Sequence, residues 1–518
     1  FGSSARGVRL EPPRRPALRG AQARRASRGH RAPASGFGGK PMDFDDLDDA
    51  IGGRPYDIVI YGATGYTGSL LVEHLDHLIS LSDATARKWA VAGRDTKKLR
   101  RIAENCKTSP GVVEACDKEG FLYLAEMCSV LVSAAGPYII CGSDIVAACV
   151  EKNTHYIDVT GELVWMKRMI KAYHEKAREK GLMIVQCAGM MCAPNDLSLY
   201  LLAKKMGALA EFREYVTEVG VGGGGGTFFS GYAGYEKMLD FELDVLQNPF
   251  SLGGERKCGR RPADEDPQKA TVDDLFPKLH LSGGHSTPCA GRLLRRSCGL
   301  FDADLEAGQG AEGEAPVSYG SELCIISRNV SLQEGAAKQK AQTTREPREI
   351  RELIKHAQTM QEAVKRGQYA PPGGGPTQAA RANGSMECFA TARSEAGDWA
   401  HVHFRGPDVY EITAMCAVTG ALVIIEELDS LRPRERGGVL TPAYAFHGST
   451  YVERLMATPY AGLRGRSMVF SVQDGKPVAE TMEKAIRSAD EKNQQIFAAS
   501  LKGTLEGAWA PPEMLAAT

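Results

Sequence analysis

The sequence predicts an α/β protein in which a doubly wound parallel sheet is followed by a second, mixed α/β domain. Between residues 56 and 187, short apolar segments alternate with helical segments at the spacing of βαβ units. After about residue 205 this alternation stops, and glycine-rich and polar segments follow. The 518 residues, 43% of them hydrophobic, suffice for two or more domains.

Five apolar, β-branched segments predict the strands of the first domain, and the segments between them predict its helices. The expected strands cover residues 56–61, 88–93, 129–136, 155–161 and 182–187, and the expected helices cover 66–79, 96–105, 143–151 and 162–180. Asp95 is expected to cap the helix that begins at residue 96. Parallel strands joined in this way carry helices on both faces of the sheet.

The rest of the chain is organised less regularly. Residues 253–318 are expected to form loops, 350–364 an amphipathic helix, 386–393 with 400–405 a hairpin, and 477–502 a terminal helix. The expected divisions are an N-terminal arm at 1–53, the first domain at 54–196, the second at 197–463 and a helical extension at 464–518.

The N-terminal segment has an unusual composition. Residues 1–41 are rich in Arg, Pro, Ser and Gly and contain one acidic residue, Glu11. Such a composition is typical of a disordered arm or an organelle transit segment, and sequence upstream of a start at Met42 is a third interpretation. If this is a transit segment, the expected location is an organelle, and otherwise the cytoplasm.

Charge and cysteine content exclude several classes of protein. The 63 basic and 64 acidic side chains nearly cancel, so no nucleic-acid partner is expected. The 13 cysteines include no C-x-x-C pair; no metal is predicted, and Cys187 and Cys192 are expected to be core thiols. His401 and His403 share one face of a strand and are expected to belong to its solvated side rather than to a metal site.

No apolar run reaches the ~18–20 residues that a membrane span requires. The nearest, residues 414–425, predicts a helix about 18 Å long that is buried in the protein or lines a substrate cleft. Any membrane contact is expected to be peripheral.

A glycine motif stands between the first strand and the first helix. It reads Tyr61-Gly-Ala-Thr-Gly-Tyr-Thr-Gly68. Glycines permit a tight turn and close approach of a pyrophosphate, and the helix N-terminus attracts the negative charge. This context predicts a Rossmann-type domain that binds a dinucleotide through Gly62, Ala63, Thr64, Gly65, Tyr66, Thr67 and Gly68.

Three further segments refine the cofactor site. Arg94 follows the second strand and can pair with a 2′-phosphate, which favours NADP over NAD. Asp117 is expected near the adenine. The loop Ala135, Gly136, Pro137 leaves a strand at its carboxyl end and is expected on the nicotinamide side, and Tyr138 is a candidate proton donor or a packing residue.

Other residues offer alternative chemistry. Asp158 and Glu162 flank the expected cleft and are candidate substrate contacts, although Glu162 also fits the first turn of a helix. Tyr200 and Lys204 have the spacing of the Tyr-x-x-x-Lys dyad of short-chain reductases, but also fit a plain amphipathic helix. The glycine run 222–226 is expected to be a hinge or a loop against substrate.

Several motifs in order resemble the saccharopine dehydrogenase-like oxidoreductases, which include the trans-acting enoyl reductases of bacterial lipid pathways. They are Gly62–Gly68, Val91-Ala-Gly-Arg94, Ala135-Gly-Pro-Tyr138, Tyr156-Ile-Asp-Val-Thr-Gly-Glu162, Pro194-Asn-Asp196, the glycine run at 222–226 with Thr227, Gly437-Gly-Val-Leu-Thr-Pro442, Phe446 and Glu453-Arg-Leu455. One departure is Cys187-Ala-Gly-Met-Met-Cys192, where members usually show Cys-Gly-Phe-Asp-Ser-Ile.

The resemblance implies a Rossmann domain, a mixed α/β substrate domain and NADPH as cofactor. It implies hydride transfer to a C=C, C=N or C=O bond of a lipid-like small molecule, in lipid or glycolipid metabolism, with a homodimer as the candidate assembly. A non-catalytic NADPH-binding protein at lipid droplets or membranes is the alternative, and a short-chain-type reductase that uses Tyr200 and Lys204 is a further one.

Overall fold

The structure is a computed structural model that describes residues 53–501, except 82–86, 191, 257–258, 268, 284–286, 309–316 and 343–369. The arm expected at 1–53, except its last residue, and the helix expected at 350–364 lie outside the described residues. All described residues belong to one compact unit of the chain, Leu47–Thr518.

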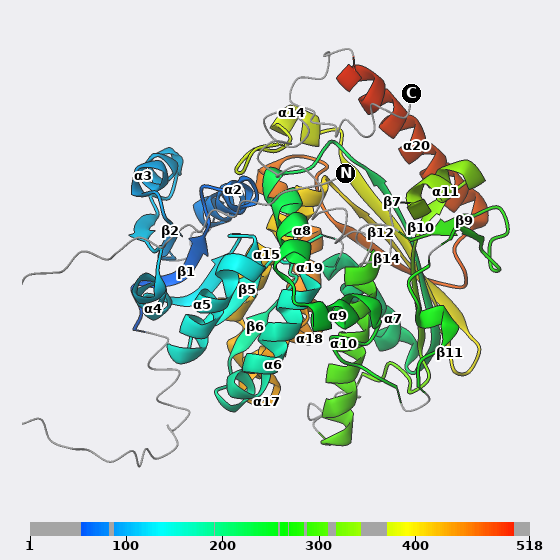
Figure 1. Ribbon diagram of the computed structural model, residues 1–518, viewed down its shortest axis with the longest axis horizontal. Helices are drawn as coiled ribbons and strands as arrows, with labels where there is room; N and C mark the ends of the chain where they lie inside the picture. Colours follow the sequence, from blue (N-terminus) through cyan, green and yellow to red (C-terminus); the bar gives the residue numbers. More distant parts are fainter. Residues whose placement is uncertain are drawn as a thin grey trace, which may run out of the picture. The chain divides into compact units, whose positions relative to one another are not determined.

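The first sheet is parallel and has seven strands in the order β13-β6-β5-β4-β1-β2-β3 (Figure 1). The strands are β1 (Tyr56–Tyr61), β2 (Trp89–Gly93), β3 (Gly111–Glu114), β4 (Cys128–Ser133), β5 (His155–Asp158), β6 (Met183–Val185) and β13 (Gly438–Leu440). The helices between them are α2 (Tyr66–Leu81), α3 (Thr96–Asn105), α4 (Lys118–Glu126), α5 (Tyr138–Glu151) and α6 (Leu163–Glu179). Without β13, this is the 3-2-1-4-5-6 order of dinucleotide-binding sheets, so the predicted doubly wound sheet is confirmed.

Both faces of this sheet are buried, which explains why its strands read as continuous apolar runs. Ile58 and Ile60 of β1 point into one core together with α2, whereas Val59 and Tyr61 point into a second core with α4, α5 and α6. Asp95 caps α3 as predicted, because its carboxylate accepts a hydrogen bond from the Lys98 amide.

The second sheet is mixed and has the order β14-β12-β11-β7-β10-β9-β8. Its strands are β7 (Leu209–Val219), β8 (Thr271–Val272), β9 (His280–Ser282), β10 (Cys324–Ser331), β11 (Ser385–Ser394), β12 (Trp399–Gly406) and β14 (Val469–Asp474). β7 and β10 run parallel, and the predicted hairpin is present as β11 and β12.

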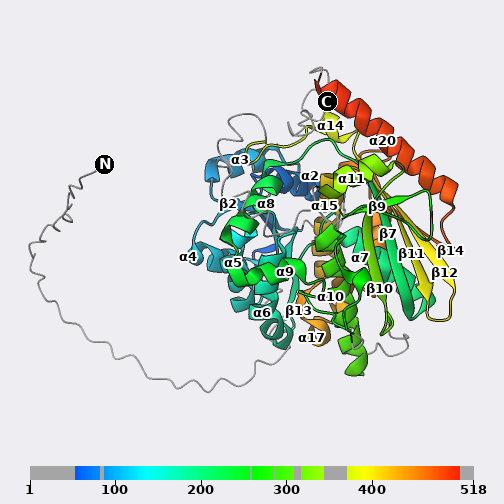
Figure 2. The same cartoon turned by 45° about the vertical axis from the view of Figure 1, so that its right-hand side comes forward.

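Helices cover both faces of the second sheet. α7 (Ala193–Met206) packs on β11 and β12, while α20 (Ala479–Leu501) crosses the opposite face, where Met482 and Ile486 join Tyr215 and Phe389 in a small core (Figures 1 and 2). The remaining helices are α8 (Gly225–Lys237), α9 (Leu243–Gln247), α10 (Thr287–Glu306), α11 (Glu334–Gln342), α14 (Gln378–Arg381), α15 (Val409–Glu426), α16 (Leu428–Leu431), α17 (Pro433–Arg436), α18 (Pro442–Phe446) and α19 (Tyr451–Ala457).

The division of the chain differs from the expected one in three places. β13 pairs with β6, so a segment assigned to the second domain completes the first sheet. The segment expected to be loops, 253–318, contains the 20-residue helix α10, and the expected helical extension begins with β14, an edge strand of the second sheet. β13 has three residues, too few for a periodic pattern to reveal it.

α15 is longer than predicted. It has 18 residues rather than the 12 of 414–425, which at 1.5 Å per residue is about 27 Å. Among the described residues it is the one helix long and apolar enough to cross a membrane, but 72% of it is buried. It packs on α2, β4 and β5 of the first sheet. Its predicted burial in the protein is therefore confirmed, and its apolar composition is that of a core helix.

Candidate active site

A cavity of about 1910 Å³ lies at the carboxyl ends of β1, β2, β4 and β5. The strand order reverses between β1 and β4, which is where doubly wound sheets bind their ligands. The cavity continues between α8, the start of α15 and the end of α20. Its volume exceeds the 300–1,000 Å³ of common small-molecule sites, so it has room for a dinucleotide and a second ligand.

The glycine motif fits a bound pyrophosphate. Gly62 has φ +83°, and a Cβ at Gly68 would lie 2.1 Å from the Gly62 carbonyl oxygen, so these two glycines form the tight turn and the close helix contact. Thr64, Gly65, Tyr66 and Thr67 line the cavity at the start of α2. A Cβ at Gly65 would meet only the Gly62 oxygen, at 3.2 Å, so its absence keeps the space before the helix N-terminus open. Ala63 lies behind this surface and is fully buried.

Two basic side chains stand at the end of β2. Arg94 is exposed and lines the cavity together with Lys98 of α3, the arrangement that a 2′-phosphate requires. Asp117 lies outside the cavity lining, and its carboxylate accepts a hydrogen bond from the Gly120 amide at the start of α4. The predicted adenine contact at Asp117 is therefore not supported, since this side chain serves as a helix cap.

The loop after β4 lies in the cavity, and the hydroxyl of Tyr138, the candidate proton donor, points toward the backbone beneath it. Ala135, Gly136 and Pro137 line the cavity as predicted. Tyr138 is 4% exposed, and its hydroxyl donates to the Ser133 carbonyl at 2.9 Å. Burial raises the pKa of this phenol well above its ordinary value. Tyr138 thus packs beneath the loop and also lines the cavity, and its role as a proton donor stays a prediction.

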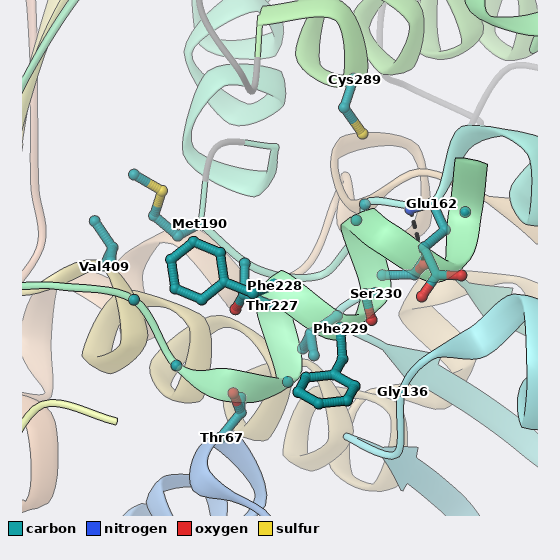
Figure 3. Close-up of a pocket in the computed structure, with 18 of the residues that line it drawn as sticks. Thr67, Gly136, Glu162, Met190, Thr227, Phe228, Phe229, Ser230, Cys289 and Val409 are labelled. Carbon is teal, nitrogen blue, oxygen red and sulfur yellow. Dashed lines mark hydrogen bonds between the residues drawn. The ribbon is translucent and has the colours of Figure 1, made fainter. Parts of the chain in front are cut away.

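Glu162 connects this loop to the cavity. Its two carboxylate oxygens accept hydrogen bonds from the amides of Tyr138 (2.7 Å) and Ile139 (2.8 Å), the first residues of α5. Ser230 of α8 lies close to this carboxylate and lowers its pKa (Figure 3). Burial raises the pKa of Glu162, and these hydrogen bonds only partly oppose the rise. A cavity-lining acid that retains its proton to higher pH is suited to proton transfer.

Asp158, the other predicted substrate contact, does not line the cavity. Its side chain is fully buried, and one oxygen accepts the amides of Cys187 (3.0 Å) and Thr160 (3.1 Å). Burial raises the pKa of Asp158 to about 7. The prediction is corrected: Asp158 ties the end of β5 to the segment after β6.

The sequence did not reveal the residues that face the glycine motif across the cavity. Figure 3 shows Thr227, Phe228, Phe229 and Ser230 at the start of α8, with Met190 and Val409 near Phe228. Gly222, Gly223 and Gly224 line the cavity just before them, which agrees with the loop interpretation of the glycine run. The Thr-Phe-Phe-Ser string after five glycines was the available signal, but its place opposite Gly62–Gly68 depends on the tertiary fold.

Two alternative sites are not formed. Tyr200 lies outside the cavity lining and stacks on Phe301, with the Lys204 ammonium 6.0 Å from its ring centre. The imidazole of His401 pairs with the Gly475 carbonyl, whereas that of His403 pairs with Glu387. These histidines are not on a solvated face as expected, because His401 is only 6% exposed.

Cys187 and Cys192 are buried, as expected of core thiols, but a third cysteine joins them. Cys289 of α10 places its Sγ 3.8 Å from that of Cys187 and 3.7 Å from that of Cys192. About 100 residues separate Cys289 from the other two, so no local pattern in the sequence could reveal this cluster.

The fold and the glycine motif define an α/β protein with a dinucleotide-binding domain. The family pattern described as "Saccharopine dehydrogenase NADP binding domain" matches residues 58–185. A "Trans-acting enoyl reductase" of Mycobacterium leprae is 28% identical over 449 residues, covering 79% of this chain and 97% of that protein. A Mycobacterium tuberculosis protein, whose name also assigns it to the trans-acting enoyl reductases, is 30% identical over 429 residues, covering 78% and 96%.

The chain therefore belongs to the saccharopine dehydrogenase-like family that includes the trans-acting enoyl reductases. It is an NADP-dependent oxidoreductase, so the predicted family and cofactor are confirmed. Among solved structures, apo saccharopine dehydrogenase (L-Glu forming) from Saccharomyces cerevisiae aligns over 80% of this chain and 99% of its own. Its TM-score of 0.40 and 11% identity are too low to support a conclusion.

Proposed function

We propose that the protein uses NADPH to reduce the C=C bond of a lipid-like enoyl substrate. The observation that carries the proposal is that Glu162 and Ser230 line one cavity together with the Gly136 loop, where a Cβ at Gly136 would lie 2.7 Å from the Ser230 Oγ. The apolar side of the cavity, with Phe228, Phe229 and Met190, fits an acyl chain. The names of the mycobacterial relatives support an enoyl group over an imine or a carbonyl.

The proposal assigns a source to the hydride and to the proton. NADPH, when bound, supplies a hydride to the β-carbon of the enoyl group, and the electron pair of the double bond moves to the α-carbon and its carbonyl. Ser230 is adjacent to Gly136, since a Cβ at Gly136 would lie 2.7 Å from the Ser230 Oγ. The Ser230 hydroxyl protonates the α-carbon, and Glu162 returns a proton to the serine.

The test is NADPH oxidation with a long-chain trans-2-enoyl thioester, with an aldehyde and an imine of equal chain length as controls. Oxidation with the enoyl compound alone supports the proposal. Oxidation with only the aldehyde or the imine contradicts the assignment to C=C. NADPH that binds but is never oxidised would favour the non-catalytic alternative.

Glu162→Gln keeps the shape of the side chain but removes the acid. We expect the turnover number to fall by at least about 10²-fold, the scale of general acid catalysis. Because the Gln nitrogen cannot accept the second of the Tyr138 and Ile139 amides, the pH dependence rather than the size of the loss is the decisive readout. In the wild type the rate should fall as pH rises through the raised pKa of Glu162, because only the protonated acid can reload Ser230. A pH–rate profile of the variant without this descent supports the relay, and an unchanged profile contradicts it.

A further inference from the structure

We propose that Cys187, Cys192 and Cys289 form a binding site for a thiophilic divalent metal ion such as Zn²⁺, with its fourth coordination position open to the cavity. This site is independent of the proposed enoyl reduction. The three Sγ atoms all lie within 4.8 Å of one another. All three residues are buried, and Cys192 and Cys289 line the cavity.

The spacing of the sulfurs is that of a tetrahedral thiolate site. With a Zn–S distance of about 2.3 Å and tetrahedral angles, two ligand sulfurs lie about 3.8 Å apart. The Cys187–Cys289 and Cys192–Cys289 Sγ distances are 3.8 and 3.7 Å. A disulfide would need about 2.05 Å and would use only two of the three thiols. The convergence of three sulfurs therefore favours an ion over a redox pair.

The three cysteines come from separate elements whose ends point to one place. Cys187 follows β6 with φ +63°, which few non-glycine residues adopt, Cys192 is the N-cap residue of α7, and Cys289 lies in the first turn of α10. Two helices thus begin at the cluster, with the positive ends of their dipoles near the sulfurs. Figure 3 shows Cys289 descending from its helix toward the cavity.

The surroundings provide what such an ion needs. Arg292, one turn after Cys289 and 1% exposed, contributes positive charge near the cluster, and its guanidinium also pairs with Asp266 at 2.9 Å. The Cys187 backbone amide is held by Asp158, which orients that ligand. The Cys187 thiol contacts the Thr160 carbonyl, so its proton must leave when the metal binds. Three protein ligands with an open fourth position are the arrangement of catalytic rather than structural zinc sites.

Cobalt titration of the full-length protein, purified under reducing conditions and treated with a chelator, tests the site. We expect one Co²⁺ per chain, an intense thiolate-to-cobalt absorption band, and loss of that band when Zn²⁺ is added. In Cys289→Ala the affinity for Co²⁺ should fall at least tenfold. Cys149→Ala, which removes an equally buried thiol from α5, should bind as the wild type does.

Three results would overturn the proposal. They are a wild type without the cobalt band, a band that persists unchanged in both Cys289→Ala and Cys192→Ala, and a Cys192–Cys289 disulfide that forms in place of metal binding. If the variants do not fold, X-ray absorption of the zinc-loaded wild type decides: three sulfur ligands near 2.3 Å support the site, and their absence contradicts it.

Discussion

Two glycine-rich segments face each other across the cavity, and they differ in what makes their glycines necessary. In Gly62–Gly68, the Cβ positions at Gly65 and Gly68 both meet the carbonyl of Gly62, within the same turn. In Gly222–Gly226, a Cβ at Gly225 would lie 2.2 Å from the Pro371 carbonyl oxygen, and one at Gly223 would enter the Phe228 ring. The first segment is constrained by its own turn at Gly65 and Gly68 and by the loop after β4 at Gly62, where a Cβ would lie 2.9 Å from the Ala135 nitrogen, whereas the second is constrained mainly by the residues packed around it.

This difference explains why only the first segment can be recognised as a binding motif from the sequence. A turn that closes on itself needs the same residues wherever it occurs, so its pattern can be recognised. A loop shaped by distant segments has no such pattern. Gly224 donates its amide to the Tyr410 hydroxyl, and Gly225 donates to the Gly374 carbonyl, at 2.9 Å. Both partners lie about 150 or more residues away.

The strongest test of the comparison is Gly65→Val. A branched side chain at this position projects into the pyrophosphate space, so we expect NADPH affinity to fall by more than about 1,000-fold, or about 4 kcal/mol. Fluorescence titration with NADPH measures the loss. Gly335→Val on α11, where a Cβ meets nothing within 4 Å, should bind normally. Wild-type affinity in Gly65→Val would show that the motif is only a structural turn.

Arg94→Ala should cause the next largest loss of NADPH affinity. It removes one charged hydrogen-bond partner of the cofactor but leaves the glycine motif Gly62–Gly68 intact. A charged hydrogen bond contributes about 1.5–3 kcal/mol, so NADPH affinity should fall about 10- to 150-fold while NADH affinity scarcely changes. Calorimetry with both cofactors measures this. Arg100→Ala, an exposed arginine of α3 outside the cavity lining, is the matched control. Equal losses for both cofactors would mean that the 2′-phosphate is recognised elsewhere.

The second glycine segment is tested by a pair of neighbouring substitutions. Gly225→Ala forces a methyl group against the Ala370 and Pro371 carbonyls and should lower the free energy of unfolding by about 1–3 kcal/mol. Gly226→Ala meets nothing within 4 Å and should change it by less than about 0.5 kcal/mol. Urea unfolding compares the two. Similar values for both would contradict the view that residues 370–371 shape this segment.

The first sheet could be predicted from the sequence because its signals are local. Each strand of the βαβ series is an apolar run, and caps such as Asp95 mark where helices begin. Tyr138 illustrates the limit of such signals. Its position after Gly136 and Pro137 predicted that it lies beside the loop, but it did not predict that its hydroxyl points toward Ser133. The direction of a side chain depends on its three-dimensional neighbours.

The parts of the candidate site that come from one short segment were predicted from the sequence. The parts that combine residues distant in the sequence were missed. The cofactor cradle and the Gly136 loop fall within single segments. Ser230 and Glu162 lie 68 positions apart, and Cys289 lies about 100 positions from the thiols it meets. Ser230 and Cys289 reach their partners because α8 and α10, which carry them, pack against the first domain. These helices belong to the part of the chain that follows the βαβ series.

β13 has a consequence for synthesis of the chain. Its partner strand, β6, ends at Val185, while β13 begins at Gly438, some 250 residues later. During translation at about 5–20 residues per second, the outer edge of β6 stays unpaired for roughly 10 to 50 s. Open strand edges promote association between nascent chains, so this interval is the period when the growing polypeptide most needs protection by chaperones. Closure of the nucleotide-binding sheet thus waits for nearly the whole chain to emerge.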